Sequence, residues 1–151
     1  MMNSTTCEDL QKHECANCTT SQTTPNAKEK GREYRFQNKS RKQVCQIKID
    51  GCYITSQEKK CDFLYIVGEC EDWYFIELKG SHLLKAVEQI TQTLDYFNSY
   101  VMGRVFARIV VTKVSHPKSI ENDARIRNLR KRLKELGGDL IYTSRLYEEV
   151  I

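Results

Sequence analysis

Two apolar segments, residues 60–67 and 73–79, constrain the fold of this chain most strongly. Both are rich in aromatic, β-branched and aliphatic residues, and near the middle both are apolar on their two faces. A strand of that kind lies inside a sheet and is covered on both sides. The connection near Gly68–Glu71 is short enough for a tight turn, so we expect the two segments to pair as antiparallel central strands.

The following segments predict helices that alternate with strands. Apolar residues recur every three or four positions over 82–100 and again over 119–136, which indicates two amphipathic helices. β-branched residues crowd 105–114, the strongest strand signal, and 139–144 is expected to be a last strand. A helix that crosses between two strands implies parallel pairing, so the sheet should be mixed. The predicted fold class is α/β, with a mixed central β-sheet flanked by helices.

The first part of the chain carries weaker signals. Residues 1–30 are polar and lack periodicity, which predicts a poorly ordered or locally tied, cysteine-containing arm before a single domain over 31–151. Residues 44–55 alternate around an Asp-Gly pair and predict either one bulged strand or a tight hairpin. Ser81 is the expected N-cap of the first long helix.

Composition sets the expected location. No run of 18 apolar residues is present, so we expect no transmembrane helix and no membrane partner. The first residues lack the apolar region of a secretory signal, which indicates a cytoplasmic protein. The seven cysteines are an odd number and should be reduced thiols there, with Cys45, Cys52 and Cys61 as small buried side chains.

One cysteine group resembles a metal site. Cys15 and Cys18 form a C-x-x-C pair, with Cys7 and His13 nearby. Four such ligands are a set that holds tetrahedral Zn²⁺. The spacing matches no zinc finger well and a second C-x-x-C is absent from the sequence, so an arm without metal is the alternative.

The most informative polar group lies on the two central strands. Asp62 begins the first strand, and Glu77 and Lys79 end the second. Antiparallel pairing brings Asp62 opposite Glu77 or Lys79, and residues two apart share a face. Two carboxylates suit Mg²⁺ or Mn²⁺, with the backbone carbonyl of Leu78 as a further ligand. Lys79 would position or activate a water, whereas a plain surface ion pair of Glu77 with Lys79 is the alternative.

These residues resemble the PD-(D/E)XK nuclease superfamily. The similarity covers about residues 44–114: Asp62, then Glu77-Leu-Lys79, then the helix 82–100 and the strand 105–114. The pattern is nearest to small Holliday-junction resolvases and restriction-type nucleases. The resemblance implies a restriction-endonuclease-like fold and a Mg²⁺-dependent endonuclease that hydrolyses DNA.

The resemblance also suggests further residues. Gln89 matches a glutamine on the helix of the resolvases, whereas Gln92 with Tyr96 fits the signature of an exonuclease branch; the two assignments compete. Asp50 is either an additional ligand or a turn residue. The chain departs from the pattern in two places, since Cys61 stands where the family has proline, and the early acidic residue has only the candidates Glu29 and Glu33.

The net charge of +4 lies in the second half of the chain, where residues 118–134 carry seven of the twelve basic side chains of residues 81–151. These are expected either to contact nucleic-acid phosphates or to form a solvated outer face. The basic residues of the expected helix 119–136 are Arg125, Arg127, Arg130, Lys131, Arg132 and Lys134. DNA is the expected partner, RNA is a second candidate, and a homodimer would supply one site for each strand. The alternative function is a non-catalytic nucleic-acid-binding or interaction module on the same fold.

Overall fold

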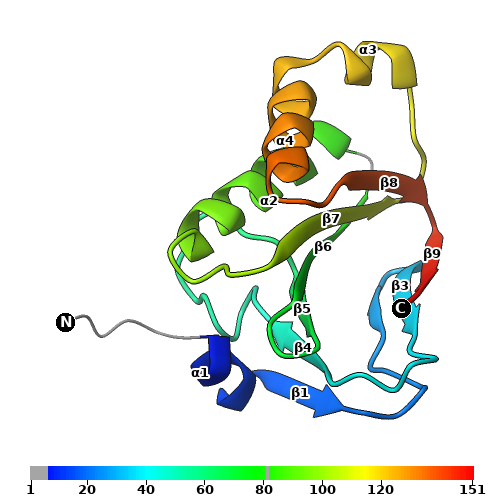
Figure 1. Cartoon of the computed structure of the whole chain (residues 1–151). Coiled ribbons are helices and arrows are strands. Elements are labelled where there is room, and N and C mark those ends of the chain that lie inside the picture. The colour runs from blue at the N-terminus through cyan, green and yellow to red at the C-terminus, as the bar shows by residue number, and fades with distance from the viewer. Residues whose placement is uncertain (1–6, 81) are drawn as a thin grey trace.

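A computed structural model describes residues 7–80 and 82–151, so Ser81, the expected N-cap, lies outside the described residues. Its main sheet has six strands in the order β1–β4–β5–β6–β7–β8 (Figure 1). Pairing is antiparallel from β1 to β6 and parallel from β6 to β8, which confirms the predicted mixed sheet. The strands are β1 (Ala16–Thr19), β4 (Val44–Lys48), β5 (Phe63–Val67), β6 (Asp72–Lys79), β7 (Arg104–Val111) and β8 (Leu140–Ser144).

Four helices are described, and the long ones lie on one face of the main sheet. They are α1 (Cys7–Lys12), α2 (Leu83–Phe97), α3 (Pro117–Glu121) and α4 (Ala124–Glu135). The single helix predicted for 119–136 is therefore two helices. The break comes at Asp123, whose carboxylate accepts a hydrogen bond from the Arg125 backbone N–H and so caps α4.

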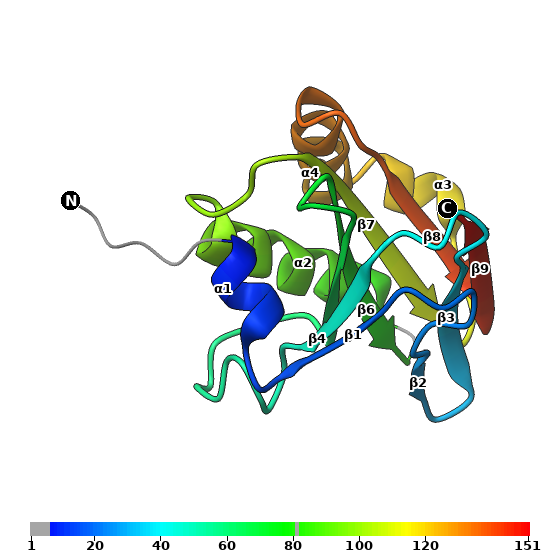
Figure 2. The same ribbon diagram turned by 60° about the horizontal axis from the view of Figure 1, so that its bottom comes forward.

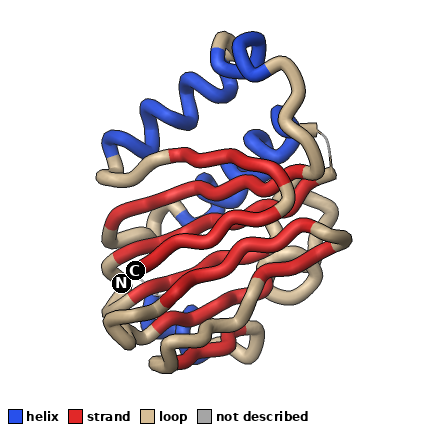
Figure 3. The backbone as a smooth tube through the Cα atoms, turned by 90° about the vertical axis from the view of Figure 1, so that its right-hand side faces the viewer, coloured by secondary structure: helices blue, strands red, loops and turns tan. Residues whose placement is uncertain are grey.

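A second sheet, not predicted from the sequence, covers the other face. It contains β2 (Ala27–Glu29), β3 (Arg32–Gln37) and β9 (Leu146–Val150), in the order β2–β3–β9. β3 and β9 run parallel although they come from opposite ends of the chain. Helices therefore cover one face of the main sheet, and the second sheet covers the other face, where helices were expected to flank the sheet. The strands of the two sheets lie together, with the long helices on one side of them (Figure 3).

Two apolar clusters follow from this layering. The larger lies between the main sheet and the helices, where Phe75, Ile90 and Leu129 are fully or almost fully buried. The smaller lies between the two sheets and is rich in aromatic rings, including Tyr34 and Tyr65. Because β6 is buried on both faces along nearly its whole length, the prediction of a covered central strand is confirmed.

The N-terminal segment is not the expected loose arm. Residues 7–30 contain α1, β1 and β2, and β1 pairs with β4 at the edge of the main sheet (Figure 2). Three disulfides hold this segment to the rest of the fold. They join Cys7 to Cys70, Cys15 to Cys52, and Cys18 to Cys45.

The disulfides correct two expectations. Cys7, Cys15 and Cys18 each pair with a different cysteine, so with His13 they do not converge on a Zn²⁺ site. Reduced thiols were expected, but in the described chain only Cys61 is free, and it is buried as predicted. Structural disulfides are typical of oxidising compartments and of intracellular proteins from hyperthermophiles. The three disulfides therefore give no support to the expected cytoplasmic location. Among the described helices, none has the length and apolar character needed to cross a membrane.

Candidate functional site

The β5–β6 hairpin brings the two predicted carboxylates together. Phe63 pairs with Ile76, and the Asp62 backbone N–H donates to the Ile76 carbonyl at 3.1 Å, which sets Asp62 opposite Glu77. The connection is the tight turn expected near residues 68–71, where Gly68 takes a positive φ of 71° that favours glycine. The predicted register therefore holds at the end of the hairpin.

Each carboxylate accepts a hydrogen bond from the facing strand. The Asp62 backbone N–H donates to Glu77 Oε1 at 3.1 Å, and the Leu78 backbone N–H donates to Asp62 Oδ2 at 2.8 Å. These reciprocal bonds fix both side chains across the two strands. The side chains are thereby pre-positioned by backbone groups that a substitution elsewhere leaves in place.

A pocket of about 400 Å³ lies at this end of the hairpin. Seven of its residues were named from the sequence: Glu29, Asp50, Asp62, Glu77, Leu78, Lys79 and Gln89. Asp50 comes from the turn after β4, since residues 44–55 form neither one bulged strand nor a hairpin but a strand ending at Lys48 and a compact turn. Gln89 comes from α2. The turn after β4, the β5–β6 hairpin and α2 thus contribute to one pocket.

Burial dominates the electrostatics of the pair. It raises the pKa of Asp62 to about 6; the Leu78 hydrogen bond opposes the shift, and the charges of Glu29 and Asp50 add to it. Glu77 is 2% exposed, and burial followed by the charge of Asp62 raises its pKa well above the usual range. Two carboxylates this close cannot both ionise at low cost. The pocket is consequently a place where an added positive charge is favourable.

The second sheet supplies residues that the sequence did not single out with confidence. Glu29 and Arg32 line the pocket from β2 and β3, whereas Glu33, the other acidic candidate, bonds to Asn26. Arg32 is 8% exposed, and its Nη1 donates to Thr112 Oγ1 at 3.1 Å while its Nε has no hydrogen-bond partner. In β3 buried and half-buried residues alternate, as expected for a strand that covers a sheet. The sequence of 32–37 did not reveal which face of the main sheet this strand covers.

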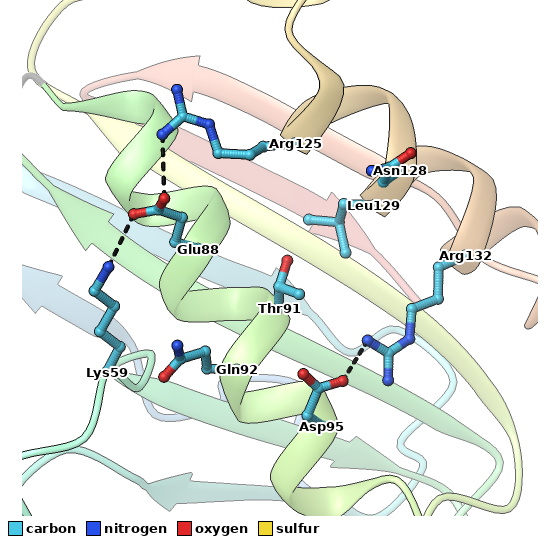
Figure 4. A pocket seen from close by; sticks show the side chains of 9 residues that line it. All are labelled: Lys59, Glu88, Thr91, Gln92, Asp95, Arg125, Asn128, Leu129 and Arg132. Carbon is cyan, nitrogen blue, oxygen red and sulfur yellow. Dashed lines mark hydrogen bonds and ion pairs between the residues drawn. The ribbon is translucent and has the colours of Figure 1, made fainter.

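The structure separates the two competing glutamines. Gln89 lies in the carboxylate pocket, where its Nε2 donates to the Lys60 carbonyl at 3.1 Å and its buried Oε1 has no partner. Gln92 instead lines a groove between α2 and α4 (Figure 4). Tyr96 is 47% exposed and lies beside Gln92 in a neighbouring pocket. Gln92 and Tyr96 therefore do not line the pocket of Asp62 and Glu77, whereas Gln89 does.

Three of the six basic residues of α4 form ion pairs with acidic side chains of the protein. Arg125 pairs with Glu88 at 3.1 Å and Arg132 with Asp95 at 2.6 Å, across the groove (Figure 4). Arg130 pairs with Glu121 at 2.7 Å. The other three basic residues of the helix, Arg127, Lys131 and Lys134, are exposed. None of the six lines the carboxylate pocket.

The donor set of the pocket suits a hard cation. Within residues 7–80 and 82–151, no group of three or more His, Cys, Asp and Glu side chains is arranged to hold a metal ion. Mg²⁺ does not require such a group, because it is usually bound through one or two carboxylates together with waters and substrate oxygens. Asp62 and Glu77 supply two carboxylates, and the unpartnered Oε1 of Gln89 adds a neutral oxygen nearby. The residues present therefore fit Mg²⁺ or Mn²⁺.

Comparison of the chain with known protein families, curated proteins and solved structures found no match. The function of the pocket is therefore inferred from its own residues.

Proposed function

We propose that this chain is a divalent-metal-dependent nuclease that hydrolyses phosphodiester bonds of DNA. One observation supports the proposal most strongly: Asp62 and Glu77, from separate strands, share a pocket with Lys79, and burial raises the pKa of both carboxyls. Enclosing two acidic groups costs free energy unless a cation or a function compensates for it. The order of the β5–β6 hairpin, α2 and the parallel strand β7 supports a restriction-endonuclease-like assignment of the fold.

Each residue of the pocket has a role in this proposal. Asp62 and Glu77 hold Mg²⁺ or Mn²⁺, which when bound lowers the pKa of a coordinated water and offsets charge on the phosphate. Lys79 positions or activates the attacking water and stabilises negative charge on the phosphoryl oxygens. Gln89 Oε1 accepts a hydrogen bond from the water. Arg32, whose Nη2 pairs with Glu29 at 3.5 Å, is the arginine of the second sheet that would contact the phosphate.

A cleavage assay tests the proposal. Plasmid, linear duplex, branched DNA and RNA are incubated with the protein in Mg²⁺ or Mn²⁺, with and without chelator. Glu77→Gln keeps an acceptor for the Asp62 N–H but removes the charge, so it should abolish cleavage without unfolding the chain. The matched control is Glu88→Gln, a carboxylate of α2 that lies outside the pocket and should leave cleavage intact.

The outcome is unambiguous for each substrate. Metal-dependent loss of DNA that persists in Glu88→Gln and disappears in Glu77→Gln supports the nuclease. Cleavage of RNA alone would change the substrate class. Cleavage that is equal in both variants would assign the activity to a contaminant or to another site and refute the proposal.

A second candidate function follows from the reciprocal hydrogen bonds. Because the Asp62 and Leu78 backbone N–H groups already satisfy oxygens of the two carboxylates, the pair also suits a structural role in locking β5 to β6. In that case the chain is a nucleic-acid-binding or interaction module without turnover. Binding of DNA without cleavage in any metal favours this candidate.

A further inference from the structure

A second hollow, of about 520 Å³, lies next to the carboxylate pocket. It is bounded by the start of α2, the segment after β7 and the short helix α3. Two lysines and two histidines line it, with two serines, Asp123 and an apolar floor. The four basic and imidazole residues are His82, Lys85, Lys113 and His116.

Lining residues of the two cavities lie close together along the chain and along α2. Lys79 and Gly80 line the carboxylate pocket, and His82 lines the hollow two residues later. The Thr112 backbone N–H donates to the Gly80 carbonyl at 2.6 Å, which holds the end of β7 beside this junction. Lys85 lies four residues before Gln89, so the two side chains are neighbours on the helix surface. A polymer in the pocket would therefore reach the hollow directly.

The positive charge of the hollow is not neutralised by the protein. Its only acidic lining residue is Asp123, whose carboxylate accepts hydrogen bonds from the backbone and guanidinium of Arg125. In the described part of the chain, Lys85 and Lys113 form no ion pair, in contrast to the paired arginines of α4. Free ammonium groups beside an apolar floor, which includes Leu84 and Ile120, suit a ligand with alternating phosphates and sugars.

We infer that this hollow binds the phosphodiester backbone of the nucleic acid next to the bond held at Asp62 and Glu77. The inference rests on the proposed function and adds to it the surface that guides the strand. Lysine ammonium groups contact phosphates without reading bases, so the hollow contributes affinity and register but no sequence preference. It also predicts that α4, although more basic in sequence, is the lesser contact surface.

Equilibrium binding tests the inference without any cleavage. Fluorescence anisotropy of labelled single-stranded and duplex DNA is measured in chelator over a series of salt concentrations. The test variant is Lys85→Ala with Lys113→Ala. The matched control is Lys131→Ala with Lys134→Ala, which removes two exposed lysines from α4. Circular dichroism confirms that both variants fold.

The expected result follows from counterion release. Removal of two phosphate contacts should lower the slope of log K against log salt by about 2 and weaken binding roughly 10- to 100-fold near 0.1 M salt. The control should change the slope by clearly less. An equal or larger effect of the control, or wild-type protein that binds neither DNA, overturns the inference.

The two proposals can fail separately. Loss of binding in Lys85→Ala/Lys113→Ala, together with absence of Glu77-dependent cleavage in the wild type, supports the hollow and refutes the nuclease. Glu77-dependent cleavage together with unchanged binding in the lysine variant refutes the hollow alone.

Discussion

Replacement of Asp62 by asparagine should stabilise the protein at neutral pH while removing a proposed metal ligand. Asparagine keeps an acceptor oxygen for the Leu78 N–H and is nearly the same size. It removes only the charge. Burial makes that charge costly, because the pKa of Asp62 is raised from 3.8 to about 6 in the folded protein.

The sign and size follow from linkage between protonation and folding. A carboxyl with a raised pKa contributes stability that is fully present below its unfolded pKa and is lost as the pH rises through its folded pKa. For Asp62 this loss falls between about pH 4 and pH 6. The rise of the Asp62 pKa from 3.8 to about 6 corresponds to about 3 kcal/mol, and partial exposure of the side chain reduces the expected gain to roughly 1–3 kcal/mol. For a chain of this size that is about 2–10 °C in Tm.

Urea unfolding in chelator measures the effect. Trp73 is the single tryptophan and is fully buried, so its fluorescence reports unfolding. The stability difference between Asp62→Asn and wild type should be near zero at pH 4 and should grow in favour of the variant up to pH 7. Asp123→Asn is the control of opposite sign, because hydrogen bonds from Arg125 lower the pKa of Asp123 to about 2, and its replacement should slightly destabilise at neutral pH.

Two outcomes would refute an electrostatic cost of the Asp62 charge. A constant stability difference from pH 4 to pH 7, or a variant less stable than wild type at pH 7, would show that Asp62 pays no electrostatic cost in the fold. Added Mg²⁺ should raise the stability of the wild type more than that of the variant.

Two further predictions concern the rest of the fold. Arg108 is 3% exposed and pairs with Glu149 at 2.6 Å, so Arg108→Met should lower the free energy of unfolding in urea by about 3–5 kcal/mol. Adding Glu149→Gln should restore part of this loss of stability. A single variant as stable as the wild type contradicts a buried pair. Burial also raises the pKa of the Cys61 thiol, so without reductant iodoacetamide should label no cysteine in the native protein. In guanidinium it should label one cysteine. Mass spectrometry that finds several labels would exclude the three disulfides.

The centre of the fold and the core of the pocket could be predicted from the sequence. Residues 60–67 and 73–79 are apolar on both faces and joined by a tight turn, which predicts antiparallel pairing with Asp62 opposite Glu77 or Lys79. The structure selects Glu77. Helix periodicity puts both Gln89 and Gln92 on roughly the side of α2 opposite its buried stripe, so the sequence could not choose between them, and only the structure places Gln89 at the pocket.

The remainder depended on contacts between distant segments. β3 and β9 pair across the length of the chain, and Tyr34 donates a hydrogen bond to Glu149, 115 residues later. Local pattern carries no information on such a partner, so Glu29 and Arg32 could not be located at the pocket. Disulfide pairing is equally inaccessible, because six cysteines allow 15 connectivities.

The origin of Arg32 in the second sheet has a consequence for how the protein is made. β3 is held between β2 and β9, and β9 leaves the ribosome after every other described strand. The Asp62–Glu77 hairpin, a local structure, can form much earlier. The acidic half of the pocket would then exist before its arginine is fixed, so a nascent chain should position Asp62 and Glu77 first and Arg32 only after β9 has emerged.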